Sequence, residues 1–166
     1  MIRYLEKQNL LILETERTSY WIGLAYSAPV CLHWGRKIAP EDADMFEPLG
    51  GHSSFDTELW RERMEYPAFD GRTFENVSLK ADVPLNLRTK GVRVQGQQAE
   101  ITLADEANVM EVCLMYRVFE DCDVIQKHAR LTANAPVRLT RMDSGACLLP
   151  HEAKPWTAHY VVGAWA

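Results

Sequence analysis

The 166-residue chain lacks several features that would place it in a specialised class of protein. It has no apolar run of about 18 residues, the length that a membrane-spanning helix requires. Its formal net charge of −5 provides no basic excess, so we expect no binding to nucleic acid, whose phosphates need a basic face. Residues 1–7 lack the apolar core of an export signal. We therefore expect a cytoplasmic protein that contacts neither a membrane nor nucleic acid.

The chain is also poor in cysteine. Its four cysteines, Cys31, Cys113, Cys122 and Cys147, are scattered and form no Cys-x-x-Cys pair. Structural zinc sites are built from closely spaced pairs of ligands, and disulfide frameworks are typical of small exported domains. We therefore expect four reduced thiols, no metal site and no cofactor.

What the sequence does contain is the period-two alternation of apolar residues that is typical of half-buried strands. The clearest case runs from Met110 to Val118, where every second residue is apolar or aromatic. Turn-forming residues follow at 120–123, and a second extended run begins at Val124. The two runs predict a β-hairpin.

Further extended runs are separated by turn signals along the chain. They fall at residues 10–14, 20–26, 30–34, 77–80, 87–94, 100–103 and 137–142. Short strands with frequent turns and little helix predict an all-β fold, an antiparallel β-sandwich that residues 1–166 form as a single domain. Between residues 38 and 74, prolines and glycines interrupt the pattern, and only residues 59–64 could form a helical turn.

Five segments also carry a family resemblance. They are Leu32-x-Trp34-Gly35-x-Lys37-Ile38, Glu65-Tyr66-Pro67-Ala68 with Gly71 after it, Tyr116-x-Val118-Phe119-Glu120-x-x-Asp123-Val124-Ile125, Leu139-x-Arg141-x-x-Ser144, and Gly163-x-Trp165. In this order the chain resembles the N-terminal β-sandwich domain of family 36 glycoside hydrolases, the bacterial α-galactosidases. The resemblance implies a galactose-mutarotase-like super-sandwich.

The resemblance implies an accessory role for this domain. Family members are retaining glycosidases that cleave terminal α-galactosyl groups, or α-N-acetylgalactosaminyl groups in some relatives. Their two catalytic carboxylates, which retaining chemistry requires about 5–5.5 Å apart, stand on a (β/α)₈ barrel after the sandwich. We expect that barrel beyond residue 166, because the apolar run 159–166 has no polar tail. This chain would then hold no catalytic residue, and would serve as scaffold, oligomer contact and part of the sugar pocket. Its expected partners are a galactoside, its own barrel and further copies of itself.

The resemblance also implies a loop that reaches the sugar, here within residues 40–64. In the family an Asp and an Arg of this loop help to hold the sugar, because charge-assisted hydrogen bonds are strong. We assign the carboxylate to Asp56 and the guanidinium to Arg61 ahead of Arg63. The predicted substrate-binding residues are Asp56, Arg61, Arg63, Trp60 for stacking on a sugar ring, and His52.

Alternatives remain open at each of these positions. Asp56 could be a turn or helix-capping residue, and Arg61 and Arg63 could pair with neighbouring glutamates at 58, 62 and 65. The carboxylates at 120, 121 and 123 could suit acid/base chemistry or calcium, but a hairpin turn explains them.

The whole chain could instead be an independent carbohydrate-binding module, which needs an exposed aromatic platform. It could also be a mutarotase-like sugar epimerase, which needs a facing acid and base. Candidates for that pair are His33, His128, His159 and Glu111.

Overall fold

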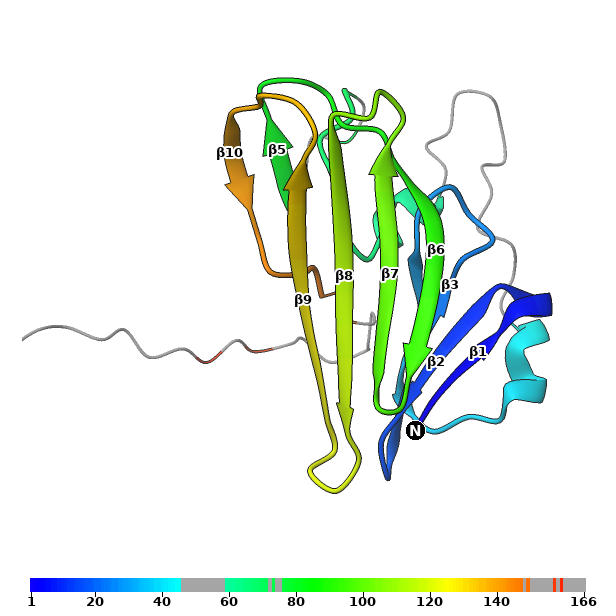
Figure 1. The fold of residues 1–166 in the computed structure, drawn as a ribbon. Helices are drawn as coiled ribbons and strands as arrows, with labels where there is room; N and C mark the ends of the chain where they lie inside the picture. Colours follow the sequence, from blue (N-terminus) through cyan, green and yellow to red (C-terminus); the bar gives the residue numbers. More distant parts are fainter. Residues whose placement is uncertain are drawn as a thin grey trace, which may run out of the picture.

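The computed structural model describes residues 1–45, 59–71, 73, 76–147, 149, 157 and 159. These residues form two four-stranded antiparallel sheets and a two-stranded one (Figure 1). The first sheet contains β1 (Ile2–Leu5), β2 (Leu10–Glu14), β3 (Thr18–Gly23) and β4 (Val30–Arg36), in that order. The second contains β6 (Leu87–Gln95), β7 (Gln98–Asp105), β8 (Met110–Phe119) and β9 (Val124–Ala133). The small sheet pairs β5 (Leu79–Ala81) with β10 (Leu139–Met142). This architecture confirms the predicted antiparallel β-sandwich.

Strand β8 shows why the sheets pack face to face. The alternation predicted from Met110 to Val118 is confirmed, because all five apolar positions of this series are buried in the main core. The opposite sheet contributes Leu11, Leu13 and Ile22 to the same core. A strand that places every second side chain on one face can bury that whole face against a second sheet.

Strand β3 is buried on both faces. Tyr20 and Ile22 belong to the main core, whereas Trp21 packs with Leu10 and Ile12 in a cluster on the other side of the sheet. The predicted strand at 20–26 ends early, at Gly23. Gly23 lies opposite the first residues of both neighbouring strands, Leu10 of β2 and Val30 of β4, so the ladders end there.

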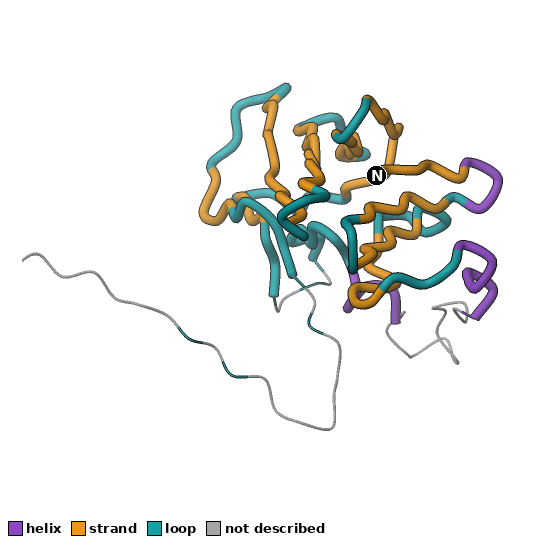
Figure 2. Tube along the Cα trace, turned by 90° about the horizontal axis from the view of Figure 1, so that it is seen from below, coloured by secondary structure: helices purple, strands orange, loops and turns teal. Residues whose placement is uncertain are grey.

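The remaining elements are short. Strand β1 was not predicted, because four residues are too few to show an alternation; it pairs with β2. Three 3₁₀ helices occur in the described residues, η1 (Glu6–Gln8), η2 (Pro40–Met45) and η3 (Leu59–Arg63). Figure 2 places η1 and η2 on the side of the molecule away from β10. No helix in the described part of the chain is long and apolar enough to cross a membrane.

The β8–β9 hairpin turns where the sequence predicted it. Asp123 has a positive φ of 56°, in the left-handed region that turn residues such as Asp tolerate. The four thiols are free; Cys31 and Cys113 are buried, and Cys122 and Cys147 are exposed.

Candidate functional site

The segment predicted to reach a sugar is described at both of its ends, η2 and η3. Asp56 and His52 lie outside the described residues, so their roles stay predictions. Trp60, Arg61 and Arg63 all lie on η3, which packs beside β4 through an isolated bridge between Met64 and Val30.

Trp60 fixes η3 to the body of the sandwich. Its side chain is only 9% exposed and packs with Ala28 and Val30. One ring face stacks on Tyr26, with centroids 6.4 Å apart and planes inclined by 27°. These contacts give Trp60 a packing role, and stacking on a sugar stays a prediction.

Arg61 is held in one orientation by two contacts. Its Nη1 lies 2.7 Å from Oδ2 of Asp70, and its guanidinium carbon lies 5.0 Å from the centroid of the Trp60 ring. Asp70 in turn accepts the Thr73 N–H at 2.7 Å. Arg61 therefore pairs with Asp70, a carboxylate that the sequence reasoning did not consider. Arg63 is exposed.

A small cavity lies next to this ion pair. It has a volume of about 20 Å³ and is lined in part by Ser27, Arg61 and Asp70. That is room for about one water molecule. A sugar ring is too large to enter it.

Glu65, two residues after η3, is the centre of a buried polar network. It is 3% exposed and accepts hydrogen bonds from the hydroxyls of Tyr20 and Tyr116, the latter at 2.9 Å. Nζ of Lys127 lies 3.3 Å from its Oε2 and 3.2 Å from the Tyr20 hydroxyl. The four side chains come from β3, β8, β9 and the segment after η3. They therefore tie η3 to both sheets.

The network changes the proton affinity of its neutral members. Burial, and next the negative charge of Glu65, raise the pKa of Tyr20 and Tyr116 well above the ordinary 10.0. Burial and then Glu65 also raise the pKa of the Cys31 thiol from its ordinary 9.0 to about 11. The loss of water around each group disfavours its charged form, and a nearby carboxylate adds to that effect. The phenols therefore remain donors over the physiological pH range.

The sequence contained one signal of this network that our reasoning missed. Strand β9 places Ile125, Lys127, Ala129 and Leu131 opposite the inward-facing residues of β8. A lysine in an otherwise apolar inward row predicts a buried partner, because an unpaired charge in a core is costly. Lys127 lies directly opposite Tyr116 in the register.

Other candidate residues are not brought together. Glu111 lies opposite Thr132 and His128 lies opposite Met115. The two side chains are therefore separated by about 13 Å along the strand direction, too far for one acid/base pair. His33 lies near the Arg36 carbonyl (Nε2···O 2.9 Å). In the described residues no three His, Cys, Asp or Glu side chains are grouped as a metal ion would need.

Comparison with known proteins decides the family. Residues 27–166 match the family model of the glycosyl hydrolase family 36 N-terminal domain. The chain belongs to that family. The resemblance predicted from the five sequence segments is thus confirmed. No curated protein sequence matches the chain significantly.

The fold recurs in solved structures of longer chains. The galactosidase domain of an α-galactosidase–sucrose kinase is 20% identical, with a TM-score of 0.70. The α-galactosidase AgaB from Geobacillus stearothermophilus is 21% identical, with a TM-score of 0.71. Each match covers 87% of this chain but only 25% and 24% of the other. The family 36 domain described here therefore spans about a quarter of the length of these proteins.

Proposed function

We propose that this chain is the N-terminal accessory domain of a retaining α-galactosidase and that it forms one wall of the sugar pocket through the segment ending at η3. The observation that carries the proposal is the family match over residues 27–166. The similar solved structures are named as α-galactosidases, one of them in complex with raffinose and another with stachyose. We assign both catalytic carboxylates to a barrel in the remainder of a longer protein, and none to this chain.

The geometry of η3 supports a role in positioning a sugar. Asp70 and Trp60 hold Arg61 in place, and Glu65 anchors the same segment to both sheets. Binding groups held rigidly before the ligand arrives lose less entropy on binding. Asp56 is the proposed carboxylate beside Arg61, Arg63 and Trp60 are further candidates, and His52 is a possible additional contact.

Two further parts of the proposal concern the setting of the protein. We place it in the cytoplasm, because Cys122 and Cys147 are exposed free thiols, which a reducing compartment preserves. We also propose that it forms homo-oligomers and contacts its own barrel. Exposed apolar side chains such as Trp34 (38% exposed), Leu139 and Met142 suit protein contacts better than water.

The first test separates the domain from the whole enzyme. The 166-residue chain and the longer protein that contains it are assayed with a nitrophenyl α-galactoside. We expect turnover by the longer protein and none by the chain alone. Turnover by the chain that disappears when one of its own carboxylates is replaced would contradict the accessory role.

The second test concerns Arg61 in the longer protein. Arg61→Ala removes the guanidinium, and Asp70→Asn disturbs the same ion pair but keeps the guanidinium. Loss of a charged hydrogen bond to a sugar costs roughly 1.5–3 kcal/mol, so we expect kcat/KM to fall roughly 10- to 100-fold in Arg61→Ala. Asp70→Asn should retain most of the activity. If both variants lose the same activity, Arg61 has only a structural role and its assignment is wrong.

A further inference from the structure

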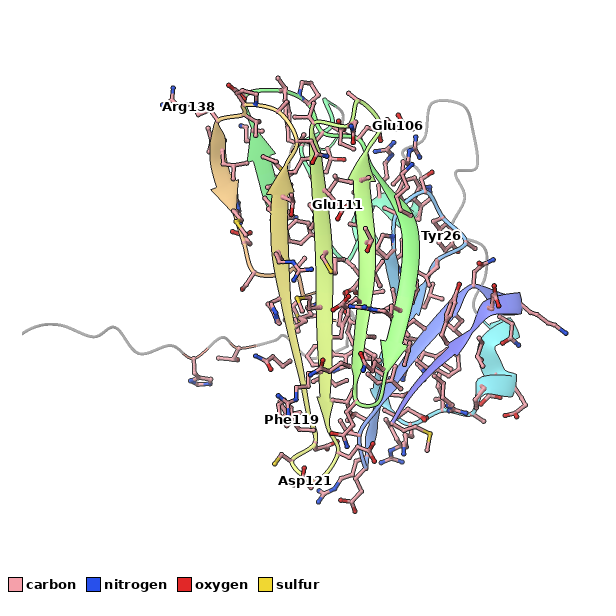
Figure 3. All side chains as sticks on the ribbon, viewed as in Figure 1. Tyr26, Glu106, Glu111, Phe119, Asp121 and Arg138 are labelled. Atoms are coloured by element: carbon pink, nitrogen blue, oxygen red, sulfur yellow. The ribbon has the colours of Figure 1, made fainter. Side chains whose placement is uncertain are left out.

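A second polar concavity opens at the edge of the sandwich, between β6 and β1. It has a volume of about 370 Å³ and is lined by Tyr4, Asn9, Leu24, Tyr26, Lys90 and Val92, among others. Figure 1 shows β6 at the edge of its sheet, with β1 leading away from it, and Figure 3 labels Tyr26 beside β6. We call this concavity the β1–β6 groove.

The groove lies at the margin of the main core. Tyr4 continues the inward row of β1 after the core residue Ile2, and Val92 lies on β6 at the margin of the same core. The register of β6 with β7 shifts between Thr89 and Gly91, so Lys90 has no partner in the ladder. A β-bulge of this kind bends its strand and re-aims a side chain.

Hydrogen bonds fix the walls of the groove. The Thr89 N–H donates to the Ser27 carbonyl (3.2 Å), which holds the β3–β4 connection on β6. The Leu24 N–H donates to the carbonyl of Asn9, whose φ of 48° is left-handed. The groove is therefore formed before any ligand binds, as most ligand sites are.

The lining has the chemistry of a site for a neutral polyhydroxyl ligand. Two tyrosines supply aromatic rings, and Leu24 and Val92 supply apolar surface for C–H groups. The amide of Asn9 and the ammonium of Lys90 can hydrogen bond to hydroxyl groups. A volume of about 370 Å³ lies in the range of small-molecule sites.

The charge of the groove argues against an anionic ligand. Arg88 also lines it, but its Nε lies 2.8 Å from Oε1 of Glu106. That carboxylate offsets the positive charge of Arg88 and leaves Lys90 as the cation that would attract an anion. Recognition of a phosphate or carboxylate usually uses several charge-assisted bonds.

We propose that the β1–β6 groove is a binding site for a neutral saccharide. Ser27 and Arg88 line both the groove and the small cavity beside Arg61. A saccharide of more than one ring in the groove would therefore extend toward η3. The proposal rests on the groove itself and does not require the chain to belong to a galactosidase.

The test is a titration of the isotopically labelled 166-residue chain with raffinose, followed by NMR of the backbone amides. We expect saturable shifts that centre on residues 4, 9 and 90. Tyrosine is over-represented among the side chains that carry most of a binding energy, so Tyr4→Ala should weaken binding about tenfold. Asn9→Gly, which suits the left-handed backbone and removes only the amide, should weaken binding severalfold.

Controls make the outcome decisive. Trp34→Ala removes an exposed aromatic ring from β4, away from the groove, and should leave the affinity unchanged. Inorganic phosphate is the anionic probe. The proposal is overturned if raffinose causes no saturable shifts, or if Tyr4→Ala binds raffinose as tightly as the parent chain does. It is also overturned if phosphate binds more tightly than raffinose and Lys90→Ala abolishes the binding of phosphate.

Discussion

At the scale of single residues, Glu65 has the largest structural role that the sequence reasoning did not foresee. Its side chain is 1% exposed and bonds to two phenols and one ammonium group. A buried carboxylate is tolerated only when its oxygens are fully hydrogen bonded. The network is therefore a condition for burying residues 65–68, which follow η3, and it holds them against both sheets.

We expect Glu65→Gln to lower the free energy of unfolding by about 3 kcal/mol, because removing one partner of a buried ion pair leaves the other uncompensated. This loss is at the low end of the range for breaking a buried ion pair, because the Lys127 side chain is 22% exposed and can turn toward water. The double variant with Lys127→Met should lose less than the sum of the single variants. Urea unfolding measures these energies. Glu62→Gln, at an exposed neighbour, is the control. Strict additivity would show that Glu65 and Lys127 do not interact.

Stability should also fall in alkali, because the folded chain retains protons that the unfolded chain releases. Burial raises the pKa of Cys31 from 9.0 to about 11, and it raises the pKa of Tyr116 above 10.0. Their contribution is fully present below pH 9 and is lost as the pH rises through the folded pKa values. The midpoint of urea unfolding, measured from pH 8 upward, should decline as the pH rises. Between pH 9 and 11 the midpoint of the Cys31→Ala variant should decline less steeply than that of the wild type. A midpoint independent of pH over this window would contradict the prediction.

At the scale of elements, the β8–β9 turn fastens the two sheets at one end. Asp123 in this turn accepts hydrogen bonds from the hydroxyl of Thr15 and the N–H of Arg17 in the β2–β3 turn, and from the hydroxyl of Thr18 at the start of β3. These bonds, Thr15 first, lower the pKa of Asp123 below its ordinary 3.8. Two hairpins far apart in the sequence are thereby joined by one carboxylate.

Substitutions at Asp123 should separate the effect of these bonds from the effect of its backbone. Asp123→Asn keeps an acceptor and tolerates the positive φ, whereas Asp123→Ala loses the acceptor and strains the backbone. We therefore expect Tm to fall slightly in the Asn variant and clearly further in the Ala variant. The difference between wild type and Asp123→Ala should be present above pH 3.8 and shrink as the pH falls through the lowered pKa. Equal Tm values for the two variants would contradict this account of the turn.

At the scale of the whole molecule, one core holds both sheets together. The main cluster includes Leu11 and Ile22 of the first sheet together with Leu103 and Val112 of the second. Neither sheet can bury its apolar face without the other, so we expect the described sandwich to unfold as one cooperative unit.

We expect the unfolding curves from tryptophan fluorescence and from far-ultraviolet circular dichroism to coincide. Leu103→Ala should shift both curves together and cost about 2–5 kcal/mol, because Leu103 is fully buried in the shared core. Leu139→Ala, on the exposed strand β10, should change stability by less than about 0.5 kcal/mol. Two separated transitions would show that the sheets are independent units.

The local pattern of the sequence was enough to predict most strands and the fold class. The alternation between Met110 and Val118 depends only on residues two positions apart, so it could be read without the rest of the chain, and it identified the buried face as well. The turn at 120–123 could be predicted for the same reason, because turn residues act on their own backbone. The helical turn at 59–64 was also predicted, and η3 carries Trp60, Arg61 and Arg63. Their contact with a sugar stays a prediction, as do the roles of Asp56 and His52, which lie outside the described residues.

Only the tertiary structure decided which distant residues meet. Glu65 and Lys127 are 62 positions apart, and Asp123 bonds to Thr15 across 108 positions, so no local period links them. The same holds for Trp60, which packs against Tyr26, Ala28 and Val30. Strand alternation places side chains on a face, but the packing of one sheet on the other selects their partners. The sequence by itself determined an antiparallel sandwich of a recognisable family, and the fold determined how its polar groups are paired inside it.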